Sequence, residues 1–263
     1  MTRVDPSFDS AQELLRVATY NIHKGVQGLG PARRLEIHNL ALAIEMLDAD
    51  IVCLQEVRSV NRKEAGYFTA WPELPQAEFL APEGYEAAYR TNAVTKYGEH
   101  GNALLSRWPI VACKHEDMSD HRFEQRGLLH VELRVAGQPL HAIVVHFGLI
   151  PASRVRQTEH LKAYIAREVP AGAPLVVAGD FNDWGTRVRR LLRVDALESF
   201  EGPRTLTYPS RYPVAQLDHI YSRGMRPLSL GAPRGRVWSR MSDHLPLIAE
   251  FNLPAEDAPK KVA

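Results

Sequence analysis

Leu175-Val-Val-Ala-Gly-Asp-Phe-Asn-Asp183 joins a run of apolar residues directly to a cluster of polar ones. A short apolar run bounded by turn-forming residues is typical of a buried strand, and Gly, Asp and Asn are all common in turns. The segment therefore predicts a core strand over residues 175–178 that ends in a polar loop at 179–183.

Polar side chains border other apolar runs of the chain in the same way. They are Asn21 after Leu15–Tyr20, Glu56 after Ile51–Leu54, His146 after Ile143–Val145, and Asp243 with His244 before Leu247–Phe251. Layered α/β folds build their sites at such strand ends. Mg²⁺ takes oxygen ligands and keeps several waters, so a few carboxylates suffice to hold it.

Helical spacing of apolar residues is clearest at 35–48, where Ile37, Leu40, Ile44 and Leu47 fall on one face. We expect a second helix over 153–168, with Ser153 as its N-cap.

The runs 128–135 and 140–147 are rich in strand-forming residues, and the turn Ala136-Gly137-Gln138-Pro139 separates them. This pattern predicts a β-hairpin. The region 60–100 contains many Gly, Pro and aromatic residues and is expected to be a long irregular loop. Long loops in compact domains are often functional.

The composition is that of an ordinary globular protein. The 263 residues are 45% hydrophobic and carry a formal net charge of +1, so no overall field attracts nucleic acid or membranes. Cys53 and Cys113 form neither a zinc-like pair nor a disulfide framework. The N-terminus lacks the apolar core of a secretion signal, and no apolar run approaches the ~18 residues that span a bilayer. We therefore expect a cytoplasmic protein, and we favour a monomer.

Seven short motifs follow one another along the chain. They are Thr19-Tyr-Asn-Ile-His-Lys-Gly25, Leu54-Gln-Glu-Val57, Gly101-Asn-Ala-Leu-Leu-Ser106, Val145-His-Phe-Gly148, Gly179-Asp-Phe-Asn182, Leu217-Asp-His-Ile220 and Ser242-Asp-His-Leu-Pro246. One tetrapeptide is a weak signal, but seven in this order are a strong one. The set resembles the endonuclease/exonuclease/phosphatase (DNase I-like) superfamily, and its short stand-alone bacterial members in particular, over about residues 15–252.

The resemblance implies an α/β fold, a four-layered sandwich in which two mixed β-sheets pack face to face between helices. We expect one domain over residues 14–252, with flexible termini at 1–13 and 254–263.

The resemblance also implies a divalent metal, Mg²⁺ or Mn²⁺. Glu56 matches the main metal-binding glutamate of the family, and Asn21 and Asp243 match residues beside the metal and the attacking water. Such a metal neutralises phosphate charge and makes water a better nucleophile.

Five further positions match catalytic residues of the family. Asp180 matches the aspartate that orients or deprotonates water, and Asn182 matches the residue that fixes that aspartate. His244 and His146 match histidines that contact the phosphate, and Asp218 matches the carboxylate that hydrogen-bonds the first of them. Either Asp180 or the Asp218–His244 pair can serve as the general base. His219 is interpreted as a plain surface or packing residue.

Three candidate substrate contacts stay open. Many nucleases of the superfamily carry an acid two residues after the first asparagine, whereas this chain has His23, which with Lys24 either contacts phosphate or belongs to a plain loop. Asn102 is either a pocket contact or the start of a strand, and Arg126 is a candidate anion contact.

A basic run and several aromatic residues bear on nucleic-acid binding. The run is Arg187, Arg189, Arg190 and Arg193, and the interleaved Val188, Leu191, Leu192 and Val194 favour a solvated helix face over a phosphate-binding patch. Trp71, Tyr97 and Trp184 are either stacking platforms for bases or packing residues.

The expected function is metal-dependent hydrolysis of a phosphate ester, with a phosphodiesterase or nuclease first. The alternatives are a lipid-head-group phosphodiesterase of the sphingomyelinase kind, a phosphomonoesterase, and a non-catalytic binding module, which would require the loss of a core residue. The loops 60–100 and 183–213 are expected to decide among substrates.

Overall fold

The central strands are apolar on both faces because each sheet is covered on both sides. In β4 (Ile51–Val57), Ile51 and Cys53 enter one apolar cluster while Val52 and Leu54 enter another. Strands of this kind form the middle layers of a sandwich. The computed structural model describes residues 14–192 and 197–253.

Two six-stranded mixed sheets form those middle layers. The first has the order β13 (Arg226–Gly231), β14 (Leu247–Asn252), β1 (Leu14–Asn21), β4, β6 (Gly98–Ser106) and β5 (Glu86–Thr95). The second has the order β11 (Glu198–Ser199), β12 (Asp218–Arg223), β10 (Leu175–Asp180), β9 (Gln138–His146), β8 (Gly127–Val135) and β7 (Ile110–Asp117). The parallel pairs are β1 with β4 and β9 with β10.

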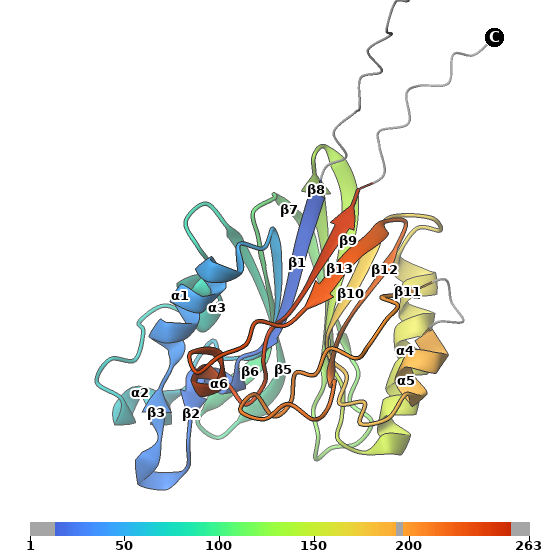
Figure 1. Ribbon diagram of the computed structural model, residues 1–263. Helices are drawn as coiled ribbons and strands as arrows, with labels where there is room; N and C mark the ends of the chain where they lie inside the picture. The colour runs from blue at the N-terminus through green and yellow to red at the C-terminus, as the bar shows by residue number, and fades with distance from the viewer. Residues whose placement is uncertain (1–13, 193–196, 254–263) are drawn as a thin grey trace, which may run out of the picture.

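Helices cover the outer faces of both sheets, as Figure 1 shows. Against the first sheet pack α1 (Ile37–Leu47), α3 (Gln76–Leu80) and α6 (Trp238–Met241). Against the second pack α4 (Pro151–Glu168) and α5 (Arg187–Leu192). The remaining short elements are β2 (Val26–Gln27), β3 (Arg34–Leu35), α2 (Arg62–Tyr67) and the 3₁₀ turns His23–Gly25 and Gly30–Ala32.

Three apolar clusters hold these layers together, one between the two sheets and one between each sheet and its helices. The predicted four-layered α/β sandwich is confirmed. Among the described residues, no helix is long and apolar enough to cross a membrane.

Two local expectations were wrong. The region 60–100 contains α2, α3 and the long strand β5, because its apolar residues pack against α1 and β6 in place of forming a loop. Ser153 lies inside α4, which begins at Pro151 after the N-cap Ile150. The Ser153 hydroxyl donates a hydrogen bond to Asp120 in place of capping the helix. The predicted flexible termini, together with Arg193 and Val194, lie outside the described residues.

The predicted hairpin is confirmed, with β8 and β9 joined at Ala136 and Gly137, which both have positive φ. Two consecutive residues of this kind form the tight turn that matches the twist of the flanking strands.

Gly179 sits in β10 with a φ of +154°, and a Cβ there would lie 1.9 Å from the carbonyl oxygen of Val145. We expect Gly179→Ala to lower the free energy of unfolding by about 3 kcal/mol, because neither backbone can move without breaking the sheet. Urea denaturation measures this change. Gly231→Ala is the control, since a Cβ at Gly231 meets nothing within 4 Å. Equal stability of the two variants would contradict this account.

Candidate active site

The register of the second sheet places three polar side chains in one row. Asp180, at the end of β10, is paired with His146 of β9 on one side and with Asp218 of β12 on the other. Paired residues share a face of a sheet. Ala178 and Val144, two positions earlier in their strands, belong to the apolar cluster between the sheets. The polar row therefore continues that inter-sheet face beyond its apolar core.

Asn21 reaches this row from the first sheet. Its Nδ2 donates a hydrogen bond to Oδ2 of Asp180 over 3.1 Å. Its Oδ1 accepts a hydrogen bond from the backbone N–H of His23 over 3.1 Å. The hydroxyl of Ser242 donates to the backbone carbonyl oxygen of Asn21 over 2.6 Å. All polar atoms of the Asn21 amide are thus oriented, and the ends of the two sheets are joined.

His244 is buried against Asp218, whose side chain has no exposed surface. Nδ1 of His244 lies 2.9 Å from Oδ2 of Asp218, and the Thr207 hydroxyl donates to the same oxygen over 2.6 Å. Burial acts to lower the pKa of His244, but the negative charges of Asp218 and Asp180 outweigh it and raise that pKa to about 10. His244 is therefore an imidazolium at neutral pH.

Asp180 is the meeting point of the row. Its Oδ2 lies 3.6 Å from Nε2 of both His146 and His244, and its Oδ1 accepts the backbone N–H of Asn182 over 2.9 Å. Burial, with added repulsion from Asp218, raises the pKa of Asp180 to about 6 against the opposing charge of His244. A carboxylate with a pKa near the working pH is suited to accept a proton.

Asn182 is held by its own turn. It has a φ of +48°, a left-handed conformation that Asn tolerates better than most residues, and its Nδ2 donates to the carbonyl oxygen of Phe147 over 2.9 Å. The loop after β10 is thereby tied to the end of β9.

Glu56 lies where β4 departs from regular pairing. The register with β6 shifts between Leu54 and Val57, and Glu56 has a φ of +59°. Bulges of this kind re-aim a side chain. The Lys24 ammonium donates to Oε2 of Glu56 over 2.6 Å. Although burial acts to raise the pKa of Glu56, the charge of Lys24 and its hydrogen bond hold that pKa well below its usual range.

Asp243 is the second carboxylate beside the row, next to His244 in the chain. Its Oδ1 lies 3.2 Å from Nδ1 of His23. Burial acts to raise the pKa of Asp243, but the hydrogen bond from His23 and the charge of His244 lower it, while the charge of Glu56 opposes them. Glu56 and Asp243 are therefore ionised and close enough to feel each other.

This donor set fits a hard divalent cation. Glu56 and Asp243 are ionised oxygen donors, each already next to a basic side chain, Lys24 or His23. Two ionised carboxylates that act on each other match the oxygen chemistry that Mg²⁺ and Mn²⁺ prefer. A second cluster of possible ligand atoms is Asp180, Asp218 and His244.

Of the other two predicted substrate contacts, Arg126 lies near the row and Asn102 joins the two sheets. Burial, followed by the charge of Arg126, lowers the pKa of His146 well below its usual value, so Arg126 is near the row. The Arg126 guanidinium donates to the carbonyl oxygen of Phe147 and to Glu124. Asn102 has no exposed surface, and its Nδ2 donates to the carbonyl oxygens of Gly127 and Val144 in the opposite sheet, which favours a structural role.

Sequence reasoning missed four residues at the site. They are Thr207, Ser242, Tyr208 and His100. Ser242 belongs to a quoted motif and could have been noted there, whereas Thr207 and Tyr208 lie in a loop without a recognisable pattern. Burial and the charge of Lys24 lower the pKa of His100 to about 4, so this imidazole beside Glu56 is neutral.

Trp184 and Tyr208 form a chain of aromatic contacts that leads to His244. Its ring meets Tyr208 edge-on with centroids 5.6 Å apart, and Tyr208 lies 4.9 Å from the ring of His244. The Trp184 side chain is 56% exposed. One part of the Trp184 ring thus contacts Tyr208 while much of the residue faces solvent. Trp71 is half-buried, and Tyr97 is exposed beside Lys63 and Lys96.

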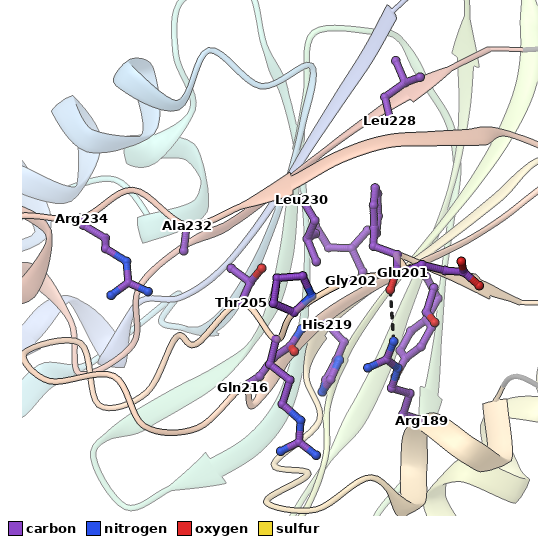
Figure 2. Close-up of a pocket in the computed structure, with 16 residues that line it drawn as sticks. Arg189, Glu201, Gly202, Thr205, Gln216, His219, Leu228, Leu230, Ala232 and Arg234 are labelled. Carbon is purple, nitrogen blue, oxygen red and sulfur yellow. Dashed lines mark hydrogen bonds between the residues drawn. The ribbon is translucent and has the colours of Figure 1, made fainter.

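Arg187, Arg189 and Arg190 of the arginine run lie on α5, where Val188 and Leu192 are buried as the solvated-face interpretation predicted. Arg189 donates to the carbonyl oxygen of Phe200 at a cavity of about 290 Å³, shown in Figure 2. His219 lines the same cavity and stacks on Tyr221. This agrees with the packing role expected of His219.

Fold and site together define a layered α/β protein with a buried row of acids and histidines between the ends of its two sheets. Comparison with known proteins agrees with this class. The family model described as "Endonuclease/Exonuclease/phosphatase family" matches residues 18–244. The protein therefore belongs to the endonuclease/exonuclease/phosphatase family, whose members hydrolyse phosphate esters.

The relatives extend over most of the chain. The uncharacterized protein YbhP of Escherichia coli (strain K12) is 37% identical over 254 residues, which are 93% of this chain and 99% of that protein. An endonuclease/exonuclease/phosphatase structure from Bacteroides vulgatus has a TM-score of 0.72 at 17% identity, over 92% of this chain and 100% of the other. The mannosyl-6-phosphatase Bt3783 of Bacteroides thetaiotaomicron has a TM-score of 0.69 at 18% identity, over 90% and 99%. At these identities the two structures show the shared fold.

Asp218→Asn removes the charge that stabilises the His244 imidazolium, so the pKa of His244 should fall by roughly 1–3 units. An NMR titration of the imidazole Cε1 proton measures this shift. Asp120→Asn is the control, because Asp120 pairs with Arg156 on the surface and does not touch His244. An unchanged His244 titration in Asp218→Asn would show that another group holds the proton.

Proposed function

We propose that the protein is a metal-dependent phosphodiesterase, with a nucleic acid or another phosphate-rich molecule as its substrate. The observation that carries the proposal is the buried row in which Asp180 contacts Asn21, His146 and His244 while Asp218 supports His244. One group of this row accepts a proton at neutral pH and another carries a positive charge, and hydrolysis of a phosphate ester needs both.

Glu56, Asp243 and Asn21 would hold the metal, Mg²⁺ or Mn²⁺. When bound, such an ion supplies positive charge that neutralises the phosphate ester and favours the ionised form of water. The low pKa values of Glu56 and Asp243 keep both carboxylates ready for a cation across the neutral range.

In our proposal, Asp180 accepts the proton of the attacking water. His244 is a poor base because it already holds a proton up to about pH 10. This favours Asp180 over the Asp218–His244 pair as the general base. The hydrogen bonds from Asn21 and from the Asn182 backbone fix the orientation of the Asp180 carboxylate.

His244 and His146 would face the phosphate with different charges. The His244 imidazolium stabilises negative charge that builds on the phosphate oxygens, and Asp218 keeps it protonated. His146 is neutral because burial and the charge of Arg126 lower its pKa, so it acts as a hydrogen-bond partner.

A basic groove beside the row supports a phosphate-rich substrate. The groove has a volume of about 1080 Å³, and Asp243, the neighbour of His244 in the chain, lines it. Five arginines line it, namely Arg34, Arg211, Arg234, Arg236 and Arg240. Within residues 14–192 and 197–253, only Arg34 of these five forms an ion pair with a carboxylate, Glu36. A single phosphate monoester would occupy a small part of such a groove, whereas a chain of phosphates would follow it.

The second candidate is a phosphomonoesterase. It is favoured by the shared fold with the Bacteroides thetaiotaomicron mannosyl-6-phosphatase. A head-group phosphodiesterase acting on sphingomyelin, which carries one phosphate, uses less of the groove and ranks third.

The test of function is a substrate panel. Purified protein is assayed with Mg²⁺ and then Mn²⁺ on bis-nitrophenyl phosphate, nitrophenyl phosphate, plasmid and abasic DNA, RNA and sphingomyelin. We expect cleavage of diesters, with loss of turnover in a chelator and recovery on adding metal. Cleavage of the monoester alone would replace the proposal by the second candidate.

Asp180→Asn and His244→Ala should each reduce kcat by about 10²–10⁴-fold while the protein stays folded, because each removes a proton-carrying group from the row. Steady-state kinetics and circular dichroism measure the two properties. Asp50→Asn is the control. Asp50 is a largely buried carboxylate that pairs with Arg107, and it precedes β4, whereas Glu56 lies near the other end of that strand. Near-normal turnover in either row variant would refute the role given to that residue.

The double variant Arg236→Gln/Arg240→Gln should raise KM for DNA or RNA and reduce the salt dependence of binding, because each phosphate contact contributes to that dependence. Turnover of bis-nitrophenyl phosphate should be nearly unchanged, since this small diester does not extend along the groove. Arg226→Gln is the control, because it removes one positive charge from an exposed arginine on β13 that does not line the groove. An equal loss on both kinds of substrate would argue against the groove as a binding track.

A further inference from the structure

A separate group of possible metal ligands, His130, Glu132 and His141, lies on the outer face of the second sheet, away from the row. His130 and Glu132 are two positions apart on β8, and His141 is the cross-strand partner of Glu132 on β9. The period of a strand therefore places the three side chains on one face. The neighbouring Ile143 on that face packs in the cluster under α4, so the site lies at the end of the sheet–helix layer.

The contacts within the cluster are close. Nε2 of His130 and Nδ1 of His141 lie 3.0 Å apart, and Nδ1 of His130 lies 3.1 Å from the hydroxyl of Tyr164. One ligand atom from each of His130, Glu132 and His141 lies within 4.8 Å of the others. His130 is 1% exposed and His141 is 6% exposed, so both rings are fixed by their surroundings.

We propose that His130 Nε2, His141 Nδ1 and the Glu132 carboxylate bind a transition-metal ion of the Zn²⁺ type. Two nitrogen ligands of tetrahedral zinc, each about 2.0–2.1 Å from the ion, are roughly 3.3 Å apart. The 3.0 Å separation seen here needs to open by only a few tenths of an ångström. Two imidazoles and one carboxylate suit Zn²⁺, whereas Mg²⁺ prefers oxygen ligands throughout.

This site is separate from the candidate active site and does not depend on the proposed function. His141 and His146 belong to the same strand, and five residues of a strand span about 16 Å. His146 also points to the inter-sheet face with Val144, whereas His141 points toward α4 with Ile143.

The protonation states of the cluster suit a metal. Metal-binding imidazoles must be neutral, and burial lowers the pKa of His130 to about 4 and also lowers that of His141. Burial raises the pKa of Tyr164 to about 12, so its hydroxyl stays neutral. With Nε2 on the metal, Nδ1–H of His130 would donate to that hydroxyl, the outer hydrogen bond that commonly orients metal-bound histidines.

Lys114 is the main charge that opposes a cation here. It lies on β7 beside His130, with its ammonium 3.9 Å from Glu132 and 3.1 Å from Glu168. The charge of Arg223 also acts on His141. Glu132 therefore serves either Lys114 or the metal, and removal of Lys114 should strengthen metal binding.

The experiment measures Zn²⁺ binding to chelator-treated protein by competition with a chromogenic chelator. Excess Mg²⁺ is present to occupy the proposed metal site at Glu56 and Asp243. Wild-type protein should bind one more Zn²⁺ per chain than either Glu132→Gln or His141→Gln. Co²⁺ in place of Zn²⁺ should give visible absorption bands that both variants lose. Diesterase turnover with Mg²⁺ should be the same in all three proteins.

Two further variants distinguish a metal site from a hydrogen-bonded histidine pair. Tyr164→Phe keeps the ring and should weaken Zn²⁺ binding by about 10–100-fold, whereas Lys114→Gln should strengthen it. His160→Gln is the control, because His160 of α4 pairs with Glu116 of β7 outside the cluster and should not change the stoichiometry. Equal Zn²⁺ stoichiometry and affinity in wild type, Glu132→Gln and His141→Gln would overturn the proposal.

Discussion

The buried carboxylate of Asp180 is the constraint on which the rest of the site depends. It ends a strand with no exposed residue, yet it receives a hydrogen bond from Asn21 of the opposite sheet and lies 3.6 Å from two imidazoles. A buried carboxylate is costly unless such partners surround it. The apolar clusters bring the two sheets together, and Asp180 sets how their ends must meet.

The electrostatics follow from this arrangement. Burial and Asp218 push the pKa of Asp180 up, while the two carboxylates together push the pKa of His244 up. Neighbouring groups whose pKa values are shifted in this way can divide the roles of base and acid between them. Beside the row, Lys24 and His23 keep Glu56 and Asp243 ionised. One fold thus provides a proton acceptor, a cation and a pair of ionised carboxylates near the same strand ends.

Local patterns predicted individual strands and their polar ends, whereas the four layers and the convergence of the row were implied by the family resemblance. The strand over 175–178 and the residues Asp180, His146 and His244 could be read from apolar runs and ordered motifs. The bulge at Glu56 and the arginine groove could not, because they depend on segments far apart in the chain. The Thr207–Asp218 contact could not either, because Thr207 lies in a loop without a recognisable pattern. The region 60–100 was misread because its short helices carry few periodic apolar residues. The cytoplasmic location and the monomeric state stay predictions.

The central claim is that Asp180 works as a base while His244 stays protonated, and the pH dependence of kcat/KM on a small diester tests it most directly. The rate should rise as pH passes about 6, where Asp180 loses its proton, and fall as pH passes about 10, where His244 loses its own. In Asp218→Asn the fall should move to lower pH and the rise should not move upward. A rate that climbs steadily through pH 10, or a profile unchanged in Asp218→Asn, would contradict the account.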